Sequence, residues 1–491
     1  MKPKPAQVCV VVALAGALVR LALAFRDETY LDRLFVPDDT YYTLAIARSI
    51  ARGLGPSADG AHLTNGFQPL LAFLLVPIAS LRGALAIGAI ADGVTAWCLG
   101  LLARRSAGSD VAAVAATTIW ALSPSAVAVS SNGLETSLTI ACVTGALVLW
   151  QKDTSRWLTG AALGLCLLAR VDTVFVVVAV GVLTLRRDGL RATWPLAAGA
   201  AAVVAPWWIY SLSRFGTFVP ESGAAVREQA MMYRAAGMVI RDQVAWAAGA
   251  IVGPPFVDWT PLREFLGKTA SGIGLVIGVL CAGAAVWLFR RTRDDVVRAA
   301  LAYALALFAF YSLYLPATWF FRRYLAPIHA VTALVVALHV RRRAWAGWCL
   351  LALVAIGRLA LATPVMTIDQ GHHGAKGYRE PARQVLALAP PGAVVGSFQS
   401  GALAWFADGT GRAVVNLDGV VDREAARAVR EHHLAAFARS RGVTHFADWE
   451  VNVKRFRERA GDATFVLRRV GEAEPQGRDE RFVLYAIDWP D

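Results

Sequence analysis

The chain of 491 residues is poor in charge and has no paired-cysteine motif. Asp, Glu, Lys and Arg make up 17% of its residues, whereas soluble domains contain about a quarter. All six cysteines lie within or beside apolar runs and no two form a C-x-x-C pair, which argues against a zinc site and against a disulfide framework. The polar region beyond about residue 375 has no cysteine, so an oxidising compartment would not alter its chemistry.

What the chain has in excess is apolar sequence. Hydrophobic residues account for 56% of the chain, and several apolar runs approach the ~20 residues that a helix needs to cross a bilayer. The net charge of +13 does not indicate nucleic-acid binding, because Lys and Arg fall between the apolar runs and form no single basic face. The sequence therefore predicts an α-helical polytopic membrane protein.

Basic clusters in the short loops set the expected topology. The positive-inside rule places them on the cytoplasmic face, and one threading satisfies them with about eleven transmembrane helices, the N-terminus inside and the C-terminus outside. The first apolar run resembles a signal peptide with a cleavage site at Ala22-Leu23-Ala24, but its length favours a retained span. The expected spans are 7–25, 84–103, 110–128, 134–151, 157–169, 173–186, 192–212, 271–290, 296–315, 324–340 and 344–362.

Two long loops and the tail then lie outside. Residues 1–365 form the expected transmembrane domain, with outer loops at 26–83 and 213–270. Residues 366–491 form a small extracytoplasmic α/β domain, because strand-like and helix-like patterns alternate there. In the first loop, the apolar segment that begins at Asn65 is too short to span and contains two prolines, so we expect it to lie along the interface. If it did span, the basic clusters that follow it would face outward.

Two adjacent carboxylates, Asp38 and Asp39, form the strongest functional candidate. They occur in "FVPDDTYYTLAIARSIARGLGP", between an apolar segment and an amphipathic one. Asp is a favoured N-cap, and the following residues have helical spacing with a Gly stop, so Asp38 is also expected to cap this helix. A cap needs only one Asp. The functional interpretation makes one carboxylate the general base for an acceptor hydroxyl, and the other an orienting group or a ligand for a divalent cation such as Mg or Mn.

The threading gathers further polar residues on the outer side, where charges at membrane depth by default suggest function. Each also has an ordinary structural interpretation. Glu135 would favour a helix dipole, Arg170 and Asp172 would form a local ion pair, and Arg322 and Arg323 would snorkel at the interface. One of these last two is a candidate for binding a lipid phosphate. The full set of substrate-binding candidates is Asn132, Glu135, Arg170, Asp172, Glu221, Arg322, Arg323, Tyr324, His62 and Asn65.

Six motifs occur in order across roughly residues 7–330. They are "PDDTYYTLAIARSIARGLGP", "HLTNGFQPL", "SNGLETSL", "LGLCLLARVDT", "RFGTFVPES" and "RRYLAP". In their joint order they resemble the bacterial GT-C superfamily of membrane glycosyltransferases, which includes protein mannosyltransferases and lipid A aminoarabinose transferases. Related sequences often carry a lysine after the P-E-S-like turn, where this chain has Val226 and Arg227.

The resemblance implies a hexosyl- or pentosyltransferase of the bacterial inner membrane. Such an enzyme moves a sugar from a polyprenyl-phosphate donor to a glycan, lipid or protein acceptor at the outer face, with one Asp of the pair as base. It also makes Arg322 and Arg323 candidates for the donor phosphate, while metal dependence varies within the superfamily. A single in-line displacement would invert the anomeric carbon.

Two other classes of protein fit parts of the pattern. A transporter or lipid-linked sugar flippase would be polytopic too, but such proteins place polar sites near the midplane and often contain inverted repeats. This chain gathers its charges on one side and shows no repeat. A membrane scaffold whose outer domain binds a partner would explain the tail, but it would not explain the clustered acidic loops.

Overall fold

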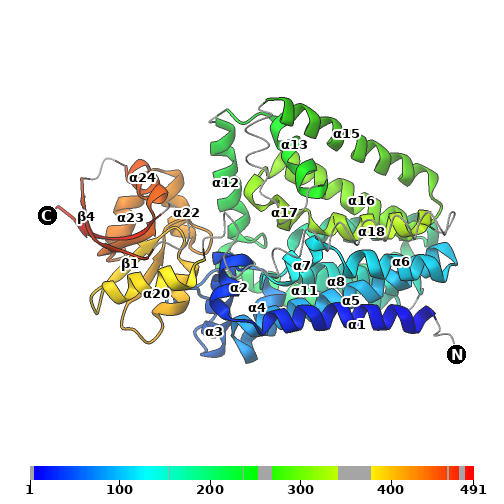
Figure 1. The fold of residues 1–491 in the computed structure, drawn as a ribbon, viewed down its shortest axis with the longest axis horizontal. Helices are drawn as coiled ribbons and strands as arrows, with labels where there is room; N and C mark the ends of the chain where they lie inside the picture. Colours follow the sequence, from blue (N-terminus) through cyan, green and yellow to red (C-terminus); the bar gives the residue numbers. More distant parts are fainter. Residues whose placement is uncertain are drawn as a thin grey trace. The chain divides into compact units, whose positions relative to one another are not determined.

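The computed structural model describes residues 5–153, 155–235, 237–252, 268–340, 377–461, 464–474 and 481–490. Its contacts divide the chain into two compact units (Figure 1). The first unit contains Met1–Ala24, Leu85–Tyr210 and Gln229–Ile368, and the second contains Phe25–Ala84, Ser211–Glu228 and Asp369–Asp491. The first outer loop is therefore grouped with the tail, whereas the sequence-based division at residue 365 had assigned it to the transmembrane domain.

The first unit is a bundle of helices. Five of the described helices are long and apolar enough to cross a membrane, and seven spans result if each of two bent pairs counts as one. The polytopic fold is confirmed, whereas the number of about eleven is not, and the expected span 344–362 lies outside the described residues. The helices are α1 (Pro5–Ala24), α5 (Leu81–Ala107), α6 (Asp110–Ala121), α7 (Pro124–Ser130), α8 (Thr136–Gln151), α9 (Arg156–Ala169), α10 (Val174–Asp188), α11 (Leu190–Phe215), α13 (Ile240–Val252), α15 (Lys268–Arg291), α16 (Asp295–Ala309), α17 (Phe321–Tyr324) and α18 (Ala326–Val340).

The predicted span 110–128 is broken by a proline. The axes of α6 and α7 differ by 56°, and Pro124 is the first residue of α7. Proline disfavours helical geometry in the residue before it and cannot donate a backbone hydrogen bond. The first turn of a new helix is the position where proline is tolerated, so the span continues in a new direction.

A buried ion pair joins three of these helices. The Arg20 side chain on α1 lies with its Nε 2.7 Å from Asp92 Oδ2 on α5, and both side chains are almost fully buried. Trp120 Nε1 on α6 donates to Asp92 Oδ1 at 2.9 Å, and Arg20 Nη2 donates to the Ala121 carbonyl. Because the charges are paired and hydrogen-bonded, their burial in an apolar bundle is tolerated.

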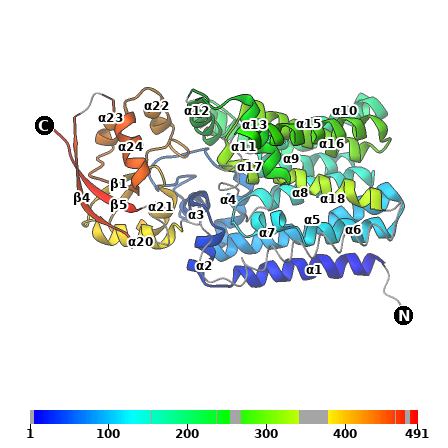
Figure 2. The ribbon, with the colours of Figure 1, turned by 45° about the horizontal axis from the view of Figure 1, so that its top comes forward.

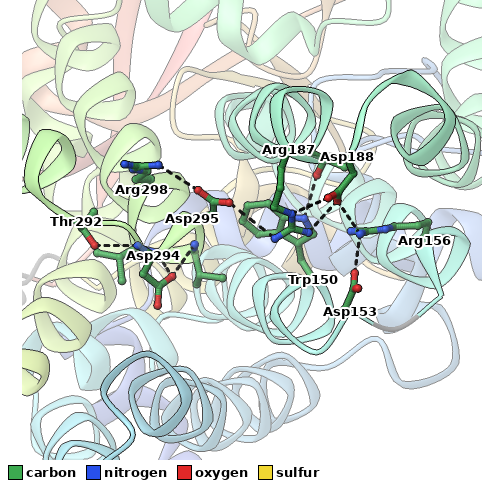
Figure 3. A network of polar contacts seen from close by, with 12 residues as sticks. Trp150, Asp153, Arg156, Arg187, Asp188, Thr292, Asp294, Asp295 and Arg298 are labelled. Atoms are coloured by element: carbon green, nitrogen blue, oxygen red, sulfur yellow. Dashed lines mark hydrogen bonds and ion pairs between the residues drawn. The ribbon is translucent and has the colours of Figure 1, made fainter.

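Three loops that carry basic clusters meet at one end of the bundle (Figure 3). Arg156 pairs with Asp188 at 2.8 Å, which joins the loop before α9 to the end of α10. Arg187 in turn lies 3.8 Å from Asp295 at the start of α16. The expectation that these loops share one side is confirmed, and the assignment of that side to the cytoplasm stays a prediction.

The second unit joins short helices of the first loop to the α/β tail. The loop forms α2 (Glu28–Leu34), α3 (Asp38–Ala51), α4 (Pro69–Leu75) and the single 3₁₀ turn Val76–Ile78. The apolar segment after Asn65 is thus too short to span, as expected. Helix α12 (Glu221–Ala235) begins in this unit.

The tail contains a five-stranded sheet in the order β2-β1-β3-β5-β4. Strands β2, β1 and β3 are parallel to one another, with Val394 beside Ala413. Strand β5 runs antiparallel to both of its neighbours, β3 and β4. The strands are β1 (Val394–Ser397), β2 (Ala413–Asn416), β3 (His445–Trp449), β4 (Val466–Glu472) and β5 (Phe482–Asp488). The small α/β fold expected from the alternating strand and helix patterns is confirmed.

Helices cover both faces of this sheet. On one face α22 (Arg423–Arg430), α23 (Leu434–Ser440) and α24 (Glu450–Arg459) enclose a core that includes Phe398, Phe446 and Phe456. On the other face lie α20 (Arg379–Leu388) and α21 (Gly401–Ala407), as Figure 2 shows. The crossover helix α21 connects β1 to β2, as parallel strands require.

Candidate active site

The acidic pair occupies the first turn of α3, but neither Asp is its N-cap. The N-cap is Pro37, which has no side chain that can accept a hydrogen bond, and Asp38 is the first helical residue. The expectation that Asp38 caps this helix is therefore wrong. Proline's fixed φ suits the start of a helix, so the chain enters α3 one residue earlier than the Asp pair suggested.

The carboxylate of Asp38 caps a different helix instead. Its Oδ2 accepts the backbone N–H of Gly401 and its Oδ1 accepts that of Ala402, each at 2.8 Å, at the N-terminus of α21. Asp38 is 3% exposed. Burial raises its pKa to about 8, although the two N–H donors lower it and the Asp39 charge raises it further. Both oxygens of Asp38 thus form hydrogen bonds with the backbone of the tail.

Glycine at position 401 permits this approach. A Cβ atom added there would lie 2.3 Å from the backbone oxygen of Asp38 and 2.9 Å from its Oδ2. Distances below 3.0 Å to a backbone atom cannot be relieved by a side-chain rotation. The contact between α3 and α21 therefore depends on the missing side chain of Gly401.

The far end of α3 completes this contact. Arg48 donates to the carbonyls of Trp405 and Ala404 at 2.9 and 3.0 Å, and Arg52 makes two bonds of 2.7 Å with the carboxylate of Asp408. The positive groups at the end of α21 complement its helix dipole. Side chains of α3 thus contact α21 at both of its ends.

Between these ends, the Tyr42 hydroxyl connects α3 to two strand ends. It lies 2.9 Å from Ser400 Oγ and accepts N–H groups from the Ser400 backbone at 3.1 Å and the Asn416 side chain at 3.0 Å. Ser400 follows β1 and Asn416 ends β2. The carboxyl ends of parallel strands are where open α/β sheets bind ligands, and in this unit α3 packs against them.

Asp418 adds a third carboxylate beside the pair. It follows β2, and its Oδ1 accepts from Asn416 Nδ2 and the Val420 backbone, each at 2.8 Å. Burial raises the pKa of Asp418 to about 7. The nearby Arg455 charge lowers this pKa, and the Asp39 charge raises it further. Asp39 is itself partly exposed. Its charge acts on both Asp38 and Asp418, so the three carboxylates are electrostatically coupled.

Two more buried carboxylates organise the surroundings. Asp448, at the end of β3, accepts the backbone N–H groups of Phe398 and Gln399 and shapes the turn that presents α21. Asp32 on α2 accepts those of Tyr378 and Arg379 at the start of α20. Sequence reasoning missed Asp32, Asp418 and Asp448. For the last two the available signal was an acidic residue directly after, or at the end of, a parallel strand.

His62, Asn65 and Glu221 also belong to the second unit. His62 pairs locally with Asp59 at 2.6 Å. Asn65 is buried, donates to Ser211 Oγ at 2.8 Å and accepts the backbone N–H of Glu221 at 3.1 Å. Burial raises the pKa of Glu221, whose carboxylate lies 3.8 Å from Arg423 Nε. Asn65 and Glu221 are thus brought together, as connectors of two loop segments.

The remaining candidates belong to the first unit. Asn132 is buried and its Oδ1 accepts the Leu134 backbone N–H at 2.9 Å, which forms the turn before α8. Glu135 is the N-cap residue of α8 but makes no side-chain cap bond. It is 6% exposed, and its carboxylate makes no hydrogen bond to the described part of the chain. A role for Glu135 in substrate binding stays a prediction.

Arg170 and Asp172 form a satisfied buried pair. Arg170 Nε and Nη2 bond to the Asp172 carboxylate at 2.9 and 2.7 Å, and the Tyr311 hydroxyl donates to the same carboxylate at 2.6 Å. Arg170 also donates to the Tyr324 carbonyl at 3.0 Å. These contacts match the ion-pair interpretation, and they fix the turn that carries the two candidate arginines.

Arg322 and Arg323 differ in their surroundings. The Arg323 guanidinium lies over the rings of Phe320 and Tyr324, at 4.5 and 5.1 Å from the ring centroids. Tyr324 stacks on Tyr311 with centroids 4.7 Å apart. Arg322 is exposed. Aromatic packing therefore orients Arg323, while the Arg322 side chain lies at the surface.

The acidic pair is not part of a larger cluster of ligand side chains within the described residues. No three His, Cys, Asp or Glu side chains converge as a ligand set within the described residues. Mg²⁺ is usually held by one or two carboxylates together with water and substrate phosphates, so a divalent-cation role for the acidic pair stays a prediction.

Comparisons with known proteins bear on the fold. No protein-family model and no curated protein sequence matches the chain. A solved structure of ArnT from Cupriavidus metallidurans, bound to undecaprenyl phosphate, matches with a TM-score of 0.57 and 13% sequence identity over 97% of each chain. The chain has the fold of ArnT. The structure of ArnT without a ligand matches almost equally, with a TM-score of 0.56 and 14% identity.

The shared fold agrees with the sequence resemblance to the GT-C superfamily. Because the match covers 97% of both chains, it includes the small tail domain as well as the helical bundle. The six motifs do not extend into the tail, so its likeness to ArnT is visible only in three dimensions.

Proposed function

We propose that this chain is a GT-C-type membrane glycosyltransferase that moves a sugar from a polyprenyl-phosphate donor to an acceptor at the outer face of the bacterial inner membrane. The fold of ArnT and the ordered motifs support the reaction class. In one of its structures ArnT holds undecaprenyl phosphate, a polyprenyl phosphate of the class that the proposed donor would release after transfer.

Asp39 is the proposed general base, and the observation that carries this choice is the commitment of Asp38. Each Asp38 oxygen accepts a backbone N–H at 2.8 Å inside a fully packed contact, so this residue has little capacity to meet an acceptor hydroxyl. Asp39 is partly exposed one position along the helix, where neighbouring side chains point about 100° apart. It is the member of the pair that an acceptor can reach, and a base must reach the proton that it removes.

The arginines after residue 320 are proposed to meet the donor phosphate. Arg322 is exposed, and the aromatic residues around Arg323 hold the turn in place. A guanidinium bonds phosphate with paired N–H groups and stabilises the charge that develops on it as the sugar departs. Attack by the deprotonated acceptor hydroxyl on the anomeric carbon breaks the sugar–phosphate bond, and the proton stays on Asp39.

Genetic complementation with a chemical readout tests the proposal. A deletion strain carries the wild-type gene, Asp39→Asn, or the control Asp27→Asn, and mass spectrometry measures its envelope glycans and glycoproteins. Asp27 is an exposed N-cap in the same loop, and asparagine is an equally good cap. We expect the wild type and Asp27→Asn to restore the missing glycan and Asp39→Asn to restore none at equal membrane levels. Full restoration by Asp39→Asn would remove Asp39 from the mechanism.

A further inference from the structure

A polar cavity lies at the opposite end of α3 from the acidic pair, and all of it belongs to the second unit. It has a volume of about 300 Å³ and is bordered by the end of α3, the loop around Asp59 and the turn between α21 and β2. Arg48 is nine residues beyond Asp39 on the same helix, or about 14 Å along its axis. The cavity is therefore separate from the proposed catalytic carboxylate.

The carboxylates that border the cavity have more of their hydrogen-bonding capacity in use than the guanidinium groups do. Three guanidinium groups, those of Arg48, Arg52 and Arg412, face two carboxylates, those of Asp59 and Asp408, so one positive charge is in excess. Asp408 is bonded by Arg52 through both oxygens. Asp59 accepts from Ser57 Oγ, from two backbone N–H groups and from the His62 ring. The carboxylates thus have little remaining capacity to accept from a ligand.

Donors, by contrast, remain available. Arg412 uses its Nε and Nη1 to bond the carbonyls of Ala389 and Thr410 at 2.8 and 3.1 Å, and Arg52 uses its two terminal nitrogens on Asp408. Within the described residues, Arg412 Nη2 and Arg52 Nε make no further hydrogen bond. A cavity with spare cationic donors and saturated acceptors favours a ligand that carries an oxyanion.

The rim of the cavity is open to close approach. Gly409 and Gly411, in the sequence "DGTGR", have φ values of +74° and +71°, and a Cβ added to either would meet nothing within 4 Å. Glycine is favoured at such φ values, and its missing side chain leaves the backbone accessible. The volume is at the low end of small-molecule sites, which suits a single sugar unit.

We propose that this cavity binds one anionic sugar through its carboxylate or phosphate group, with Arg412 and Arg52 as the donors. The site is a second saccharide-binding site of the protein, beyond the donor and the Asp39 centre. This proposal depends on the cavity and the charges that border it. Its test measures binding and does not require the protein to transfer a sugar. Its failure would leave the proposed transferase activity untouched, and the reverse also holds.

Binding of simple probes to the full-length protein in zwitterionic nanodiscs tests this proposal. Isothermal titration uses glucuronate, glucose 6-phosphate, glucose and inorganic phosphate. We expect saturable binding of at least one anionic sugar with a Kd on the order of 1 mM, and none of glucose. Preference for glucuronate identifies a carboxylate ligand, and preference for glucose 6-phosphate identifies a phosphate ligand. Inorganic phosphate that binds as tightly as either sugar would overturn the assignment to a saccharide.

Matched variants locate the binding. Arg412→Gln removes a donor, and Ala413→Glu places a carboxylate at an exposed position on the rim, where it competes with the ligand. Each should weaken binding at least tenfold, while Ala413→Gln, which adds similar bulk without charge, should weaken it less than Ala413→Glu. Arg427→Gln, on the exposed face of α22, should leave binding unchanged. Equal binding by wild type, Arg412→Gln and Ala413→Glu would contradict the proposal.

Discussion

Replacing Asp38 by alanine should release α21 from α3 without touching the proposed base. The change removes the acceptor for the N–H groups of Gly401 and Ala402, both of which are buried. A buried donor left unsatisfied costs about 1–3 kcal/mol, so two cost about 2–6 kcal/mol. The raised pKa of Asp38 shows that its own burial is unfavourable, which offsets part of this loss. We expect a net destabilisation of about 2–4 kcal/mol.

Hydrogen exchange of the amides in α21 measures this loss directly. Exchange through local opening reports the free energy of that opening, and about 1.4 kcal/mol corresponds to a tenfold change in rate. The amides of residues 401–407 should therefore exchange about 30- to 1,000-fold faster in Asp38→Ala than in the wild type. The control Asp39→Asn, which keeps the shape of its side chain, should leave these rates within a few-fold. Unchanged protection in Asp38→Ala would refute the capping role.

Three further predictions concern stability. Because the folded pKa of Asp38 is raised from 3.8 to about 8, its contribution to stability falls as pH rises between these values. Raising pH from 5.5 to 8 should cost about 3 kcal/mol, measured by thermal unfolding of the second unit, and Asp38→Asn should flatten this dependence. Gly401→Ala should lower stability by about 1–3 kcal/mol, whereas Gly223→Ala, on an open helical position, should not. Arg170→Gln should cost about 3–5 kcal/mol because it leaves Asp172 buried without its charge partner; an unchanged melting temperature would contradict this.

The helices and most strands were predictable because their signals are local. Apolar runs of near-span length became α1, α5, α11, α15 and α16, and the alternation of strand and helix patterns gave the α/β tail. Helix α20, helix α24 and strand β4 carry weaker local signals. They are polar and short, and β4 lies largely exposed at the sheet edge, so its sequence carries little apolar periodicity.

The partners of the charged residues were not predictable, because they are distant in sequence. Asp38 reads locally as a cap for the helix that follows it, yet its carboxylate bonds residues more than 360 positions away. Arg20 and Asp92 each lie within an apolar run, but nothing in the sequence indicated that they pair with each other. Sequence singled out Asp38, and the fold supplied its partners.

The most direct test of the central claim is the rate of product formation per inserted Asp39→Asn molecule. Membranes from the complemented deletion strain give the rate from glycan mass spectrometry and the amount of folded protein from detergent-solubilised material. Loss of a general base typically lowers a rate by about 10²–10⁴-fold. The account predicts a loss of this size, with α21 protected from exchange as in the wild type. A rate within a few-fold of the wild type, with the protein folded, would contradict it.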